Sequence, residues 1–168
     1  MAEPITSVLV GELIPATVVL VHGNFLGPWS WSDVTEILAN AQVSVKTVRL
    51  PSSTTNRTGP RGDLYEDATQ VRAVLDSLRG PVVLCGHSYG GAVITEAAAG
   101  PHPAVRRLVC LTGAAPDVGE RLASLVSAAE ESDGAADAAR EAVRLRPDGM
   151  IELGPDSARL SLFHDCSP

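Results

Sequence analysis

The stretch from Pro81 to Gly91, PVVLCGHSYGG, decides how this chain folds. Its first half, Pro81 to Cys85, is a short apolar run without polar alternation, which is typical of a strand buried on both faces of a parallel sheet. Its second half has the form G-x-S-x-G around Ser88 and opens a segment with helical spacing, Tyr89 to Ala99. A strand, a tight glycine-rich turn and a helix in succession predict that Ser88 stands at a sharp bend at the carboxyl edge of the sheet.

Three further segments outside this stretch have the composition of strands. Ala16 to Val21 and Arg107 to Leu111 are short apolar runs rich in Val and Leu, so we expect buried strands there too. Val43 to Leu50 has polar residues interleaved among its apolar ones and is interpreted as a fourth strand. Two of the three cysteines, Cys85 and Cys110, fall inside the apolar runs and are interpreted as core residues rather than as a disulfide or metal site.

Helical segments separate these strands. Asp63 to Arg79 carries apolar residues at helical intervals, and Asp63 is placed to cap its N-terminus with Glu66 three residues on. Ser30 to Asn40 is a second helix, for which Ser30 or Ser32 is the expected cap. Because strands and helices alternate, we predict an α/β fold with a doubly wound parallel sheet and right-handed crossovers.

The G-x-S-x-G pattern in this context is typical of a nucleophile elbow. Such a turn forces the serine into a crowded backbone conformation, and the small residues Gly86 and Gly90 let the strand and the helix approach each other closely. The competing interpretation is a glycine-rich turn without chemistry. In the chemical interpretation, Ser88 is the candidate nucleophile beside the positive end of the following helix.

A second signal lies at the end of the first strand, where His22, Gly23, Asn24 and Phe25 follow one another. In an α/β-hydrolase the loop at this place supplies one backbone N–H to the oxyanion hole, and the residue after the nucleophile supplies the other. The candidate donors are therefore Asn24 or Phe25 together with Tyr89. Each such donor is worth about 3 kcal/mol, because the negative charge that it stabilises grows only in the transition state.

Several segments together resemble the α/β-hydrolase superfamily, in particular its esterase, methylesterase and hydroxynitrile-lyase-like group. The similar stretches are Val19–Gly23, Gly27–Trp31, Cys85–Gly91, Leu111–Asp117 and Phe163–Cys166. The resemblance implies a hydrolase of small carboxylic esters in which Ser88 is acylated. It also implies a partial α/β-hydrolase core over residues 1–115 and a partial helical cap over residues 116–168, shaping an apolar pocket.

The chain departs from that family in its catalytic triad. Family members order the triad as nucleophile, acid and histidine, with the acid after a later strand and the histidine in a loop near the C-terminus. This sequence stops at Pro168 within the cap. Asp117 is the candidate acid, against the alternative of a polar residue at the cap hinge. His164 is the candidate base, against packing, hydrogen bonding or plain exposure. Activity of the chain is therefore in doubt, and we keep two alternatives: a non-catalytic remnant or small-molecule-binding module, and a lyase of the hydroxynitrile kind.

Composition and sequence patterns indicate which partners, location and cofactors to expect. The net charge of −7 gives no reason to expect nucleic acid as a partner. The apolar stretch near the start is too short to cross a bilayer and no secretory pattern precedes it, so we expect no membrane and a cytoplasmic location. No ligand cluster or dinucleotide fingerprint is present, so we expect no metal and no cofactor.

The Arg107 to Leu111 strand would form an exposed apolar edge, which predicts self-association.

Overall fold

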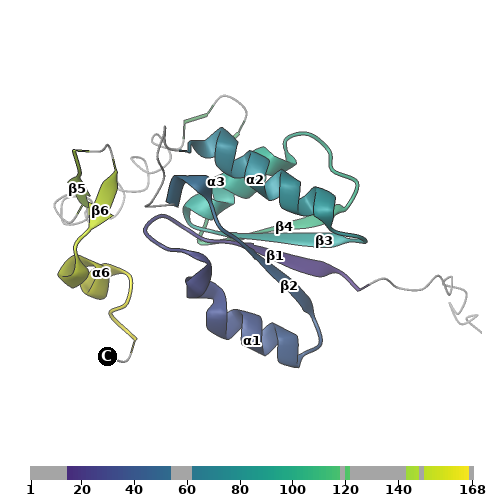
Figure 1. Ribbon diagram of the computed structural model, residues 1–168, viewed down its shortest axis with the longest axis horizontal. Helices are drawn as coiled ribbons and strands as arrows, with labels where there is room; N and C mark the ends of the chain where they lie inside the picture. The colour runs from purple at the N-terminus through teal and green to yellow at the C-terminus, as the bar shows by residue number, and fades with distance from the viewer. Residues whose placement is uncertain (1–14, 54–61, 118–119, 122–142, 148–149, 167–168) are drawn as a thin grey trace, which may run out of the picture.

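The computed structural model describes residues 15–53, 62–117, 120–121, 143–147 and 150–166 (Figure 1). Its main sheet has the strand order β2-β1-β3-β4, and all of its strand pairs are parallel. The strands are β1 (Thr17–Val21), β2 (Ser44–Val48), β3 (Val82–His87) and β4 (Val105–Leu111). Each end of these four strands lies within two residues of the segment that the sequence predicted. The predicted fold class is confirmed.

Helices cover both faces of this sheet. Figure 1 places α1 (Ser32–Asn40) on one face, and α2 (Leu64–Ser77) and α3 (Tyr89–Ala98) on the other. Two short 3-10 turns, η1 (Pro28–Trp31) and η2 (Pro51–Ser53), follow β1 and β2 at the carboxyl edge of the sheet. This is the doubly wound arrangement that the alternating pattern predicted.

The hydrophobic core lies between the sheet and the α2–α3 layer. Side chains from β1, β3 and both helices meet there with less than one tenth of their surface exposed, and these include Val19, Val21, Leu84, Val71, Leu75, Val93 and Ile94. In contrast, α1 has no buried residue. The side of the sheet that carries α2 and α3 therefore supplies most of the packing that fixes the ends of β1 and β3.

The prediction that β4 is buried on both faces was wrong. All residues from Arg106 to Leu111 are exposed, with Leu108 and Leu111 at 42% and 48%. Among the described strands, β4 pairs only with β3, so its outer edge has no strand beside it. Cys110 is accordingly exposed rather than a core residue, and all three cysteines are free.

The helix caps follow the prediction at one helix and depart from it at another. The Asp63 carboxylate accepts hydrogen bonds from the backbone N–H groups of Tyr65 and Glu66, each at 2.9 Å, as expected for the start of α2. The cap predicted for α1 was wrong, because the hydroxyls of Ser30 and Ser32 donate backwards to the carbonyl oxygens of Gly27 and Trp29. These bonds belong to the η1 turn, whose last residue, Trp31, is the N-cap of α1.

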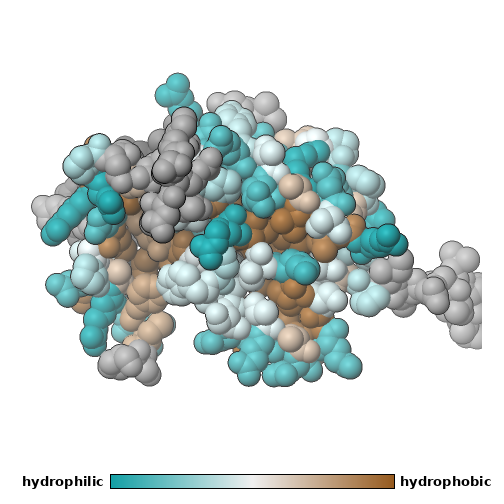
Figure 2. Space-filling view, viewed as in Figure 1, coloured by the Kyte–Doolittle hydropathy of each residue, from teal (hydrophilic) through white to brown (hydrophobic). Residues whose placement is uncertain are grey.

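The C-terminal part forms a small unit beside the sheet. Strands β5 (Val143–Leu145) and β6 (Ile151–Leu153) pair antiparallel, and α6 (Pro155–Ser161) begins at a proline. Residues 122–142 of the cap expected over residues 116–168 lie outside the described residues. Figure 2 shows hydrophobic surface at this end of the molecule, where Leu145 and Leu160 are each 77% exposed. No helix in the described ranges is long and apolar enough to cross a membrane.

Candidate active site

Ser88 lies at the junction between β3 and α3 and has an unusual backbone conformation. Its φ of 52° and ψ of −121° are sparsely populated by residues other than glycine. Hydrogen bonds on both sides hold this bend. The Ser88 N–H donates to the Leu111 carbonyl at 3.2 Å, and the Ser88 carbonyl accepts from the N–H groups of Gly91 and Ala114 at 2.9 and 3.2 Å.

The absence of side chains at two neighbouring positions makes the bend possible. A β-carbon added to Gly86 would lie 2.2 Å from the Gly90 carbonyl oxygen, and one added to Gly90 would lie 2.5 Å from the Val21 carbonyl oxygen. Both distances are shorter than any van der Waals contact. The glycines of the G-x-S-x-G pattern are therefore required by the approach of α3 to the ends of β1 and β3.

The loop that follows β1 passes directly beside Ser88. A β-carbon on Gly23 would lie 2.9 Å from the Ser88 β-carbon. Farther along this loop, Phe25 has a φ of 62°, which turns the chain sharply. Within the described part of the chain, the backbone N–H groups of Phe25 and Tyr89 donate to no protein acceptor. The structure thus brings the predicted oxyanion loop, Ser88 and Tyr89 to one place.

The Ser88 side chain is exposed and makes no capping hydrogen bond to α3. All four histidines of the chain lie in described segments, and none is hydrogen-bonded to Ser88. The His87 ring faces Trp31 edge-on with ring centres 6.3 Å apart, and His102 contacts Asp76 at 3.2 Å. The hydroxyl of Ser88 therefore has no imidazole partner in this structure.

The candidate acid and base of the sequence interpretation are both exposed. Asp117 follows β4, and its backbone N–H donates to the Glu120 carboxylate at 2.9 Å. His164 lies in the turns that follow α6. Neither side chain contacts Ser88 by a hydrogen bond that the structure records, so the roles assigned to Asp117 and His164 stay predictions.

His22 is fully buried beneath this site. Its Nδ1 lies 2.9 Å from the Gly23 carbonyl oxygen, so Nδ1 carries the proton and donates. Burial lowers the pKa of His22, and the hydrogen bond to Gly23 and the negative charge of Asp67 oppose that effect only in part. The ring is therefore neutral at pH 7 and supports the loop after β1 rather than supplying charge.

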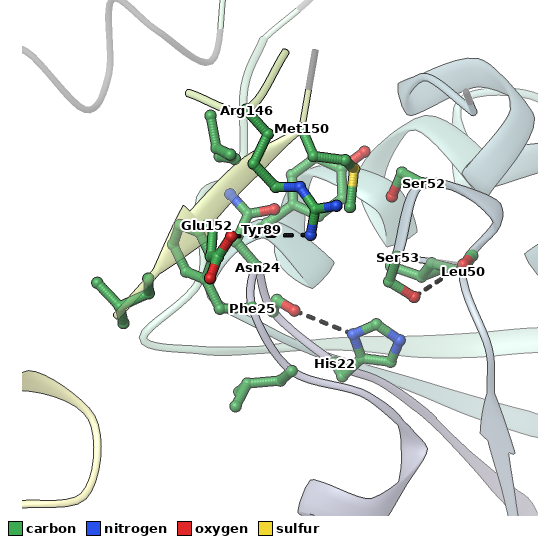
Figure 3. A pocket seen from close by; sticks show the side chains of 14 residues that line it. His22, Asn24, Phe25, Leu50, Ser52, Ser53, Tyr89, Arg146, Met150 and Glu152 are labelled. Atoms are coloured by element: carbon green, nitrogen blue, oxygen red, sulfur yellow. Dashed lines mark hydrogen bonds and ion pairs between the residues drawn. The ribbon is translucent and has the colours of Figure 1, made fainter. Parts of the chain in front are cut away.

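A cavity of about 450 Å³ opens between this loop, η2 and the β5–β6 hairpin (Figure 3). Its apolar wall consists of Phe25, Leu26, Leu50, Met150, Ile151 and Leu153. Its polar lining includes Ser52, Ser53 and Tyr89, and an ion pair between Arg146 and Glu152 spans the hairpin at 3.7 Å. Ser88 is not among the lining residues, although the adjacent Tyr89 and both candidate oxyanion residues of the loop are.

One buried acid near the cavity was missed by the sequence interpretation. Asp67 on α2 has no exposed surface, and its carboxylate accepts hydrogen bonds from Ser52 N–H at 2.9 Å, Ser52 Oγ at 2.5 Å and Tyr89 Oη at 2.8 Å. The sequence could have indicated the importance of Asp67 through its position on the helix. Asp67 falls on the apolar face of its helix, one residue before Ala68, and an acid at such a place must have partners.

The arrangement of the Ser88 bend, the loop after β1 and the parallel sheet agrees with a comparison to known families. Residues 18–166 match the sequence profile described as the alpha/beta hydrolase family. This chain belongs to the alpha/beta hydrolase family.

Named relatives of this chain are esterases and hydrolases. A carbendazim hydrolyzing esterase of Nocardioides sp. (strain SG-4G) is 36% identical over 117 residues, covering 66% of this chain and 47% of the relative. A probable hydrolase, R7, of Phoma sp. is 34% identical over 109 residues, covering 61% and 44%. The structure of polyneuridine aldehyde esterase has a TM-score of 0.73 and 26% identity, covering 91% of this chain and 64% of that one. The chain therefore spans about half the length of these two relatives and about two thirds of the solved structure.

Proposed function

We propose that this hydrolase acts on small carboxylic esters with Ser88 as its nucleophile. The observation that supports this most strongly is the strained backbone of Ser88, at the carboxyl end of β3 and directly beside the loop after β1. Strain of this kind persists only where surrounding packing fixes it, and it is common at catalytic positions.

In the proposed reaction, Ser88 Oγ attacks the carbonyl carbon of the ester and the π electrons move onto the carbonyl oxygen. The N–H groups of Tyr89 and of Asn24 or Phe25 stabilise that oxyanion, and the N-terminus of α3 adds its positive dipole end. Collapse of the intermediate expels the alcohol, which leaves with the proton of the serine. Water then hydrolyses the acyl-serine by the same steps and releases the acid.

Turnover by this chain is expected to be slow. Removing the serine proton needs a base, and no histidine of the chain is hydrogen-bonded to Ser88. A serine hydroxyl without a base is a poor nucleophile at neutral pH. Serine hydrolases that lack triad members retain roughly 10³- to 10⁴-fold acceleration over water, from the oxyanion hole and binding alone.

The cavity beside the site favours a compact, partly apolar substrate. Leu50, Ile151 and Leu153 supply apolar lining. Ser52 and Ser53 lie beside Leu50, and their hydroxyls donate to Asp67 and to the Leu50 carbonyl. We therefore favour short acyl or aryl esters. The name of the Nocardioides esterase adds carbendazim to the substrates worth testing.

The decisive experiment compares the wild-type chain with Ser88→Ala. We expect a fluorophosphonate probe to label the wild type and not the variant, and para-nitrophenyl acetate to be hydrolysed slowly only by the wild type. Ser77→Ala is the matched control, because Ser77 is exposed at the end of α2 and its hydroxyl donates to the Val74 carbonyl. Equal labelling of wild type and Ser88→Ala would exclude Ser88 as the nucleophile. Absence of both signals in the wild type would support the alternative of a non-catalytic binding module.

A further inference from the structure

The carboxylate of Asp67 connects three elements that surround the cavity. It belongs to α2, its partner Ser52 belongs to η2 after β2, and its partner Tyr89 is the first residue of α3. Ser52 and Tyr89 both line the cavity, whereas Asp67 itself lies behind them and does not. These hydrogen bonds therefore link a residue in the interior of the helical layer to two residues that line the cavity.

The cost of burying Asp67 indicates that its contacts are specific. The side chain has no exposed surface and sits on the helix face that also carries Ala68 and Val71. A buried carboxylate without partners costs several kcal/mol, so such groups are retained only with well-formed hydrogen bonds. Three donors within 2.5–2.9 Å satisfy this one.

The phenol of Tyr89 is fixed in its protonated form by the same contact. Burial raises the pKa of Tyr89 most, and the hydrogen bond to Asp67 and the charges of Asp67 and Asp63 raise it further. The hydroxyl therefore donates to Asp67 over the whole physiological pH range. This hydrogen bond fixes the end of the Tyr89 side chain that lies farthest from the backbone.

From this geometry we infer that Asp67 is a positioning residue, which holds Tyr89 and Ser52 so that the backbone after Ser88 keeps its orientation toward the loop after β1. The inference rests on the proposed function of Ser88 and extends it to a residue that never touches the substrate. Oxyanion stabilisation requires N–H groups fixed to within about 0.5 Å, and a misplacement of about 1 Å costs on the order of 100-fold in rate.

The test measures the rate of Ser88 labelling by a fluorophosphonate in Asp67→Asn and Tyr89→Phe. Each variant removes the contact between the phenol and the carboxylate from one side, and we expect each rate to fall about 10- to 100-fold. The double variant should be no slower than the slower single variant, because both changes remove the same contact. Asp76→Asn is the matched control, since it makes the same chemical change on α2 at an exposed position that faces His102. It should label at the wild-type rate.

A second measurement does not depend on activity. The chain has two tyrosines, and Tyr65 is 66% exposed, so in a Tyr65→Phe background the ultraviolet absorbance of tyrosinate reports Tyr89 alone. In Asp67→Asn the midpoint of Tyr89 should fall by about one pH unit or more, whereas Asp76→Asn should leave it unchanged.

The outcomes separate this inference from the proposed function. Loss of the difference between wild type and Ser88→Ala would overturn the proposed function, whatever Asp67 does. Ser88-dependent labelling that stays at the wild-type rate in Tyr89→Phe, or rate losses that multiply in the double variant, would overturn the positioning role. If Asp67→Asn does not fold, Tyr89→Phe tests the same contact by removing one partially buried hydroxyl.

Discussion

The proposed chemistry of this chain depends on a few atoms around Ser88, and the residues there show why sequence patterns succeed at some positions. Ser88, Gly86 and Gly90 were recognisable because each satisfies a strict geometric demand of a strand-to-helix turn. Asp67 was not, because its importance comes from contacts with Ser52 and Tyr89, which lie 15 and 22 residues away. Local patterns report backbone geometry, whereas long-range pairs emerge only when the chain folds.

The first residue-scale prediction concerns Gly86. In Gly86→Ala the new methyl group would lie 2.2 Å from the Gly90 carbonyl oxygen, so β3 and α3 must separate. We expect a loss of about 2 kcal/mol or more in the free energy of unfolding, measured by urea denaturation, and a loss of Ser88 labelling. Gly154→Ala is the control, because nothing lies within 4 Å of its added methyl and its φ is −64°. Equal stability of both variants would show that the close approach at the elbow is not needed.

At the scale of secondary structure, the sequence predicted where elements lie better than how they are buried. The strands and the three main helices follow from apolar runs and helical spacing, which are local properties. The burial of β4 was predicted wrongly because an apolar run shows that a strand suits a buried place, but not whether neighbouring elements cover it. The Ser30 and Ser32 hydroxyls were misassigned because a serine before a helix serves a preceding 3-10 turn equally well.

The capping of α2 gives a prediction at this scale. In Asp63→Ala the N–H groups of Tyr65 and Glu66 lose their shared acceptor, which should lower the free energy of unfolding by about 1 kcal/mol. Asp63→Asn retains a side-chain oxygen at the same place and should cost much less. Chemical denaturation of the three proteins checks this, and a loss in Asp63→Asn equal to that in Asp63→Ala would indicate that charge rather than the cap is responsible.

At the scale of the whole molecule, buried side chains are concentrated on one side of the sheet. The α2–α3 layer and the inner strands β1 and β3 supply the packing, so the carboxyl ends that carry the candidate site are held from one side. In contrast, β4 pairs with β3 alone among the described strands, and it exposes apolar side chains from both of its faces. Unpaired edges of this kind are a common route to association between chains.

We therefore expect two copies of this chain to pair through β4. An antiparallel pairing suits the strand, because it places Arg106 and Arg107 near the apolar C-terminal end of the neighbouring copy instead of near its arginines. Leu108→Lys should shift the population toward monomer by about tenfold or more in sedimentation velocity, since a charge on an edge strand opposes pairing. Leu160→Lys is the matched control, because Leu160 is an equally apolar residue, 77% exposed on α6 rather than on the sheet edge. A wild-type chain that stays monomeric at 100 μM, on the order of the concentrations at which exposed edges associate, would contradict the pairing, as would an equal effect of both lysines.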